Sequence, residues 1–224
     1  MKTMKDGLGE SGMIINNPKS SVPLKTTKCV TMLDYNLYQK LLSEKKDSSY
    51  NSKWYDKTYD IFCKHGYVKS IKELHVLIAF AYSWMPTVPE IHIDKIEDQN
   101  KLISELQKLH EDDVSVLPEL VLQLTPYINN SIVGTSKVLH FVAPNIVPVI
   151  DSRVVVGWHK FFNKHPVGNY SKALPKNSNS LKPDHFISYQ SKMKEWADNI
   201  KMHLVDKNAL RELEIKLYLL GKTK

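Results

Sequence analysis

The sequence has few cysteines and no long apolar run, and each shortage excludes a class of protein. Its two cysteines, Cys29 and Cys63, cannot supply the four thiolates of an iron–sulfur cluster and have no metal-ligand spacing, so we expect no metal and no cofactor. No apolar stretch approaches the roughly 20 residues of a membrane span, and MKTMKDGLGESGM lacks the apolar centre of a secretory signal. We therefore expect a cytoplasmic protein with no membrane partner.

Arginine is almost missing, yet the chain is basic. The formal net charge is +7 and the pI is near 9.1, while Arg153 and Arg211 are the only arginines. A basic balance favours a polyanionic partner, most commonly nucleic acid. Lysine is well suited to contacts with phosphates, whereas recognition of a base through two hydrogen bonds is better made by arginine. If DNA is the partner, the composition predicts contacts with its backbone.

Helical periodicity begins near Leu33 and continues to the end of the chain. Residues 1–28 carry turn formers and lysines without a period, which predicts a loosely ordered arm before a single helical domain over 29–224. The segment 163–184 is rich in Pro, Asn, Ser and Lys and predicts a loop. Helices are predicted near 34–45, 52–66, 70–85, 97–110, 118–128, 135–143 and 152–162, with two more over 185–221. No internal repeat and no strand pair appears, so the predicted fold class is all-α.

The region 118–160 combines two apolar helices, a small polar turn and an acid after an apolar run. The turn residues 129–131 and Gly134 separate PELVLQLTPYI from TSKVLHFVA, which predicts a helix–turn–helix. A turn of this kind can point backbone N–H groups outward to hold a phosphate. Pro144 then breaks the second helix, and IVPVI is expected to cross the core as an extended segment before Asp151.

Asp151 has a structural and a chemical interpretation, and the two are compatible. Aspartate is a preferred N-cap, and a cap contributes ~0.5–2 kcal/mol. The positive end of the helix dipole also holds such a carboxylate ionised. An ionised carboxylate can stabilise an oxocarbenium-like transition state or orient an attacking water.

Two short motifs resemble those of the helix-hairpin-helix DNA glycosylase superfamily. They are Gly134-Thr135-Ser136-Lys137 and Pro148-Val149-Ile150-Asp151-Ser152-Arg153-Val154. The resemblance covers roughly residues 118–160. It implies a two-lobed all-α fold without an iron–sulfur cluster, with a hairpin at about 118–143 and a catalytic-loop region at 144–160, both at a cleft between the lobes.

The resemblance also assigns roles to single residues. It implies that Asp151 is the family's essential aspartate and that Arg153 lies in the DNA-binding surface. Its phosphate-binding turn corresponds to Ile132, Val133, Gly134 and Thr135. Two departures stand out: Ile132 replaces the first glycine of the family's hairpin, and Ser136 precedes Asp151 by fewer residues than is usual.

The residue two positions after the hairpin glycine decides the chemistry in that family. A lysine there attacks the sugar and forms a Schiff base, whereas a non-nucleophilic residue leaves a monofunctional enzyme that uses water. This chain has Ser136 at that position and Lys137 next, about 100° apart on a helix. An ungapped match therefore predicts a monofunctional enzyme, which we favour from the sequence. A turn longer by one residue would make Lys137 the nucleophile.

A glycosylase must stack its flipped base against aromatic or apolar groups. The candidates near the matched region are His140, Trp158 and His159, with Tyr82 and Trp84 at the end of an earlier helix. Each is also consistent with an ordinary core residue.

Three functions follow from these patterns. The first is a monomeric DNA N-glycosylase that acts on double-stranded DNA and associates with the nucleoid when bound. The second is a non-catalytic helix-hairpin-helix DNA-binding protein, and the third is an all-α interaction protein in a host–virus conflict. The sequence leaves the excised base open.

Overall fold

The computed structural model describes residues 33–44, 53–205 and 207–222, and its regular elements there are helical. The prediction of an all-α chain is confirmed. Within these residues no strand forms, and Ile91 and Ile128 make an isolated antiparallel bridge. The predicted N-terminal arm, residues 1–28, lies outside the described residues, as does Cys29.

The α-helices are α1 (Tyr35–Ser43), α2 (Lys53–Lys64), α3 (Ile71–Tyr82), α4 (Gln99–His110), α5 (Leu117–Tyr127), α6 (Ile132–Val142), α7 (Ser152–Lys164), α8 (Pro183–Ile200) and α9 (Ala209–Lys222).

Short 3-10 turns connect several of these helices. They are η1 (Ile93–Lys95), η2 (Val114–Val116), η3 (Tyr170–Ala173), η4 (Ser178–Ser180) and η5 (Lys201–His203). Two of them, η3 and η4, lie in the predicted loop 163–184. That segment therefore has local helical turns but no long helix.

Side-chain caps fix several helix starts at the residues that the sequence indicates. Ser70 accepts the Glu73 N–H at 3.3 Å, as its capping-box spacing predicts. The Glu73 carboxylate accepts the N–H of Lys69 at 2.6 Å instead of closing the box on Ser70. α3 ends at Tyr82, three residues before the predicted end at residue 85, and Pro86 lies beyond the helix.

The turn before α6 is shorter than the sequence indicates. Asn129 and Asn130 make it, with φ values of 54° and 49° in the left-handed region, which asparagine tolerates well. Gly134 was expected in the turn and instead lies in the first turn of α6, where its N–H donates to Ser131 Oγ at 3.0 Å. A Cβ on Gly134 would lie 2.6 Å from the Tyr82 hydroxyl. The glycine therefore permits a close approach of α3, and it does not supply an unusual backbone angle.

Two further glycines let α7 and α9 cross at close range. A Cβ on Gly157 would lie 1.9 Å from the carbonyl oxygen of Leu217, and one on Gly221 would lie 1.8 Å from that of Arg153. α9 runs through Gly221 to Lys222, so this glycine packs against α7 rather than ending the helix.

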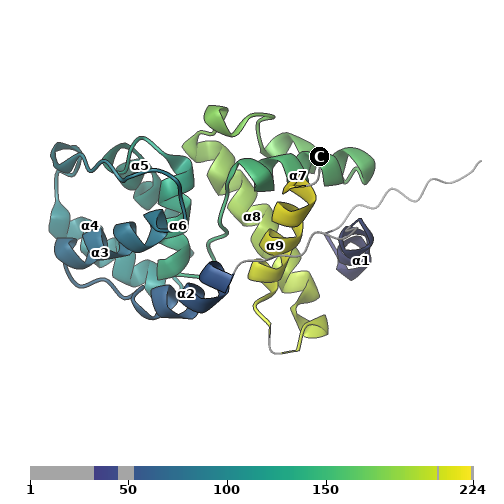
Figure 1. Ribbon diagram of the computed structural model, residues 1–224, viewed down its shortest axis with the longest axis horizontal. Helices are drawn as coiled ribbons and strands as arrows, with labels where there is room; N and C mark the ends of the chain where they lie inside the picture. Colours follow the sequence, from purple (N-terminus) through teal and green to yellow (C-terminus); the bar gives the residue numbers. More distant parts are fainter. Residues whose placement is uncertain (1–32, 45–52, 206, 223–224) are drawn as a thin grey trace, which may run out of the picture.

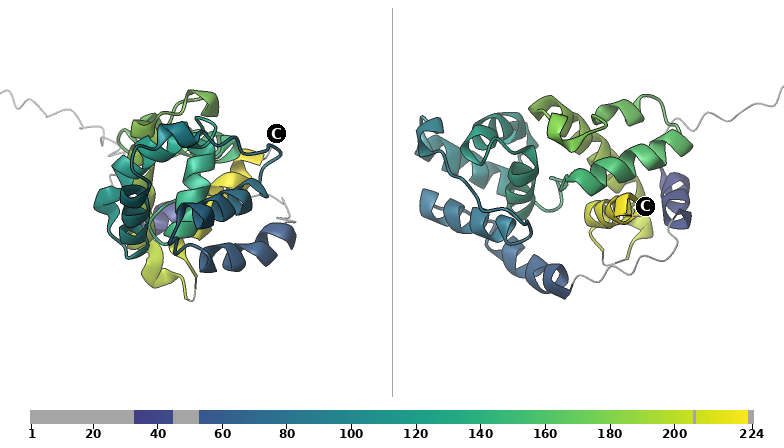
Figure 2. Two further views of the ribbon diagram at one scale, coloured as in Figure 1. Left: turned by 90° about the vertical axis from the view of Figure 1, so that its left-hand side faces the viewer. Right: turned by 45° about the horizontal axis from the view of Figure 1, so that its top comes forward.

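The helices gather in two groups in space. Figure 1 and the views of Figure 2 show α3, α4, α5 and α6 on one side of the molecule and α7, α8 and α9 with α1 on the other. The segment between α6 and α7 passes from one group to the other (Figure 1). This segment carries IVPVI, and it ends at Asp151.

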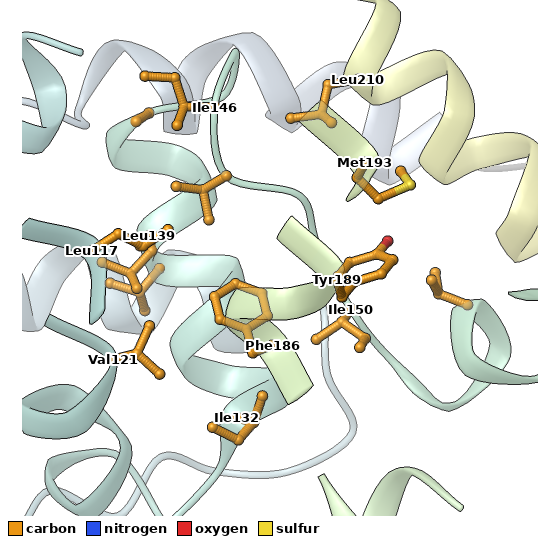
Figure 3. Close-up of a cluster of buried hydrophobic side chains, with 14 of the residues drawn as sticks. Leu117, Val121, Ile132, Leu139, Ile146, Ile150, Phe186, Tyr189, Met193 and Leu210 are labelled. Carbon is orange, nitrogen blue, oxygen red and sulfur yellow. The ribbon is translucent and has the colours of Figure 1, made fainter. Parts of the chain in front are cut away.

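Buried apolar side chains join the two groups. Figure 3 shows Leu117, Val121 and Leu139 from α5 and α6 beside Phe186 of α8, with Ile150 of the extended segment next to Tyr189. All are buried in one hydrophobic cluster. The extended segment therefore lies inside the core, as predicted. In the described part of the chain, none of the helices has the length and apolar character needed to cross a membrane.

Candidate active site

The extended segment 146–150 is buried without a neighbouring strand, so its backbone polar groups need side-chain partners. α6 supplies two of them. Ser136 Oγ accepts the N–H of Ile150 at 3.2 Å and lies 3.3 Å from its carbonyl oxygen. His140 Nδ1 lies 2.6 Å from the carbonyl oxygen of Val147. Because that oxygen only accepts, the Nδ1 carries the proton.

α8 and α9 supply the other partners. The Tyr189 hydroxyl donates to the carbonyl oxygen of Val149 at 3.1 Å, and Gln190 Nε2 donates to that of Ile146 at 3.0 Å. The Glu214 carboxylate accepts the N–H of Val149. Side chains of three helices therefore fix the residues that lead into Asp151.

Asp151 is the N-cap of α7, as predicted. Its backbone is extended, and its carboxylate accepts the N–H of Val154 at 2.8 Å. One carboxylate oxygen is thus committed to the cap. The side chain is half-buried and lines a cavity, which makes the carboxylate accessible to a ligand there.

This cavity has a volume of about 650 Å³, within the range of small-ligand sites. We call it the Asp151 cavity. Its lining comes from α2, the segment after α3, α6, the end of the extended segment with Asp151, the start of α7, η4 and α9.

Lys137 lies in the wall of the Asp151 cavity, and only 7% of the residue is exposed. Burial lowers the pKa of its amine from 10.5 to about 8, since the charged form loses hydration. The Asp151 carboxylate opposes this shift, and the positive charge of Arg211 adds to it. The neutral, nucleophilic form of the Lys137 amine is therefore reached at a lower pH than for an ordinary exposed lysine.

Ser136 is turned away from this cavity. It is fully buried, and its hydroxyl lies 2.9 Å from the Val133 carbonyl oxygen in addition to its contacts with Ile150. The two adjacent residues thus have different environments, as their helical separation predicts.

α9 forms the wall that carries Arg211 and Glu214. Arg211 donates to Glu214 at 2.9 Å, and its guanidinium lies 4.8 Å from the ring centroid of Tyr59 and 5.6 Å from that of Trp84. Glu214 is 2% exposed. Burial raises the pKa of Glu214 to about 7, against the opposing effect of Arg211.

His140 is a buried structural histidine. Its Nε2 lies 3.0 Å from the Tyr59 hydroxyl and accepts from it, because Nδ1 carries the proton. Burial, and then the charge of Arg211, lower the pKa of His140 to about 3, so the ring is neutral. Its Nδ1 lies 3.5 Å from Glu214 without forming an ion pair.

Some of the other residues that were predicted for the site line the cavity, and the rest do not. Val133, Arg153 and Trp84 line the Asp151 cavity together with Lys137 and Asp151. The predicted residues outside its lining are Ile132, Gly134, Thr135, Ser136, His140, Tyr82, Trp158 and His159. Trp158 donates its N–H to the Tyr170 carbonyl oxygen at 2.9 Å, and His159 Nε2 lies 3.0 Å from the Pro175 carbonyl oxygen.

The lining also contains residues that the sequence did not indicate, among them Tyr55, Arg211, Glu214 and Tyr218. Three of them, in α9, are spaced so that they share one helical face. The chain has only two arginines, and one of them lies with a glutamate on an otherwise apolar face of this helix. That pattern could have indicated α9 as part of a functional site. Within the described ranges, no group of three or more His, Cys, Asp or Glu side chains is placed to hold a metal ion.

Comparisons of the chain with protein-family models, curated proteins and solved structures give no match.

Proposed function

We propose that the chain is a DNA N-glycosylase of the helix-hairpin-helix type, with two helical lobes and the Asp151 cavity as the cleft between them. It acts as a monomer on double-stranded DNA in the cytoplasm and associates with the nucleoid when bound. The observation that carries the proposal is the pairing of a buried lysine, Lys137, with a capping aspartate, Asp151, in one cavity.

The local geometry favours Lys137 over a water held near Ser136 as the nucleophile. Lys137 lines the cavity and has a pKa lowered to about 8, whereas the Ser136 hydroxyl is bonded to backbone groups in the core. We therefore propose the bifunctional chemistry that the resemblance implies for a lysine at this place.

In this reaction the neutral Lys137 amine adds to C1′ of the flipped nucleotide while the C1′–N bond breaks. The base leaves with the bonding electron pair and takes a proton from solvent water. The Asp151 carboxylate stabilises the positive charge that develops on the sugar and accepts the proton that the amine releases. The ring then opens as Asp151 returns that proton to O4′, which leaves a protonated Schiff base between Lys137 and the sugar.

DNA binding would use the basic charge of the chain and the start of α6. The amides of Ile132 and Val133 lie in the first helical turn, where no intrahelical carbonyl is within reach. Arg153 is exposed at the cavity. These groups suit phosphates beside a flipped nucleotide.

The test compares wild type with Asp151→Asn on duplexes that each carry one damaged or modified base. Asparagine is as good an N-cap as aspartate, so α7 should be retained. We expect base release to fall at least about a hundredfold while DNA affinity changes little, since the charge stabilises the transition state.

The matched control is Asp98→Asn. Asp98 caps α4 by the same kind of bond, to Lys101 N at 2.9 Å, and does not line the cavity. This variant should release bases at the wild-type rate. Unchanged release by Asp151→Asn, or no release by wild type from any duplex, would refute the proposal. Salt-sensitive DNA binding without release would instead support the non-catalytic alternative.

A further inference from the structure

The backbone of Val149 and Ile150 is held by side chains at both its N–H and its carbonyl groups. The N–H of Val149 donates to Glu214, and its carbonyl oxygen accepts from Tyr189. The N–H of Ile150 donates to Ser136 Oγ, which also lies 3.3 Å from the carbonyl oxygen of Ile150. Because no strand of the described residues pairs with this segment, these side chains determine how it is rotated about its own axis.

The rotation of this segment decides where the Asp151 carboxylate points. In an extended chain successive side chains lie on opposite sides, and residues two apart share a side. Val149 and Asp151 both line the Asp151 cavity, whereas Ile150 between them is fully buried in the core. A shift of the chain by one residue would exchange the two sides. The bonds to the backbone of Val149 therefore also orient Asp151.

Glu214 is the charged partner of Val149, and both of its oxygens are engaged. Its Oε1 accepts the N–H of Val149, and its Oε2 accepts from Arg211 at 2.9 Å. A carboxylate makes a stronger hydrogen bond with a backbone N–H than a neutral acceptor does. The residue is 2% exposed, so it offers little surface to a ligand. Glu214 can therefore act on the site through Val149 rather than through contact with a substrate.

Folding stability alone does not account for an acid at this position. Burial raises the pKa of Glu214 to about 7 against the opposing effect of Arg211, because the carboxylate loses hydration. Buried ion pairs can often be replaced by apolar side chains of similar volume without loss of stability. Such a replacement would fill the space but would leave the N–H of Val149 without its acceptor.

We propose that Glu214 is a positioning residue, which holds Val149 so that the Asp151 carboxylate faces Lys137. The inference rests on the proposed glycosylase function. Asp151 and Lys137 line the same cavity and their charges interact. The proposed reaction needs them in register, since Asp151 takes the proton that the Lys137 amine releases. A displacement of about 1 Å at such a group can slow a reaction about a hundredfold.

The experiment measures single-turnover formation of the borohydride-trapped adduct on a duplex with an abasic site, with full-length protein in excess. It is run at about pH 9, above the pKa values of about 8 for Lys137 and about 7 for Glu214, so neither titration affects the comparison. The rate constant at saturating protein reports the arrangement of the reacting groups. The amplitude reports the fraction of folded protein, and the concentration at half-maximal rate reports DNA affinity. A residue that only stabilises the fold would change the amplitude and not the rate constant.

Glu214→Met removes the acceptor for Val149 and keeps a side chain of similar length. We expect its rate constant to fall at least about tenfold, with DNA affinity unchanged. Glu214→Gln keeps an oxygen that can accept the same N–H, so its rate constant should stay within about threefold of wild type. The double variant Arg211→Met/Glu214→Met removes the buried pair together and serves if Glu214→Met does not fold. It should be slowed at least about tenfold as well.

The matched control is Glu44→Met. Glu44 also holds two groups, Lys164 Nζ at 2.8 Å and His165 Nε2 at 2.7 Å, and it lies outside the lining of the cavity. Its replacement therefore removes a carboxylate that ties two helices together, far along α7 from Asp151. The rate constant of this variant should equal that of wild type.

A wild-type rate constant in folded Glu214→Met, or in the double variant, would overturn this inference while the proposed function stands. A Glu214→Gln protein as slow as Glu214→Met would also overturn it, because the charge and not the bond to Val149 would then matter. No adduct with wild type would overturn the proposed function itself, and this inference with it.

Discussion

Replacing Lys137 with methionine should make the protein more stable at pH 7. Lys137 is held as a largely buried amine whose pKa is lowered from 10.5 to about 8. The folded state therefore opposes protonation of this group, whereas the unfolded chain does not. Methionine has a similar length and no charge to bury, so it fills the same space without that cost.

The magnitude follows from the linkage between proton binding and folding. One pKa unit corresponds to about 1.4 kcal/mol, so lowering the pKa from 10.5 to about 8 costs about 3 kcal/mol of folding free energy. The full cost applies below about pH 8, where the amine is protonated in both states. Between about pH 8 and 10.5 the unfolded state binds more protons, so the wild type gains stability as the pH rises.

Urea denaturation at several pH values from 7 to 10.5 measures this difference. Lys137→Met should exceed wild type by up to about 3 kcal/mol at pH 7, and the gap should close towards pH 10.5. Lys72→Met, at an exposed position on α3, should show neither effect. A Lys137→Met protein that is less stable than wild type at pH 7 would show that the lysine contributes net stability and would refute the reasoning.

Two further predictions concern the same helix. Ser136→Ala should lower the free energy of unfolding, as measured by chemical denaturation, by about 1–3 kcal/mol, because the buried N–H of Ile150 loses its partner. The variant should still form a Schiff-base adduct. Loss of the adduct in a folded Ser136→Ala protein would contradict the structural role of Ser136. The rate of adduct formation with an abasic duplex should rise about tenfold per pH unit below about pH 8 and level off above it, since the neutral amine of Lys137 is the reactive form; a rate that is flat from pH 6 to 9 would contradict this assignment.

The helices could be predicted because local signals and periodicity agree in most of them. Asp151 shows this well: an aspartate after an apolar run predicted a cap, and its bond to Val154 confirms it. The exact turn before α6 could not be predicted, because Gly134 is explained by the approach of Tyr82, a residue about 50 positions earlier. Contacts of that kind depend on tertiary packing and leave no periodic trace in the sequence.

In the candidate site, too, local features could be predicted from the sequence, whereas features that depend on tertiary packing could not. The motif region contains Lys137 and Asp151, and the sequence indicated that Ser136 and Lys137 would face different ways. The extended segment decides which of these two side chains faces the cavity. The Ser136 hydroxyl bonds to the backbone of Ile150 in the core, and Lys137 lines the cavity. Arg211 joins the cavity through the packing of α9 beside α7, far from the motifs in sequence. The sequence could therefore show that Arg211 is unusual on its helix, but it could not place it beside Asp151.

The most direct test of the central claim is borohydride trapping on a duplex with an abasic site, followed by mass spectrometry of the digested adduct. This substrate requires no knowledge of the excised base. We expect one reduced adduct, on Lys137, that Lys137→Met abolishes. No adduct, or an adduct on another lysine that persists in Lys137→Met, would contradict the assignment of Lys137 as the nucleophile beside Asp151.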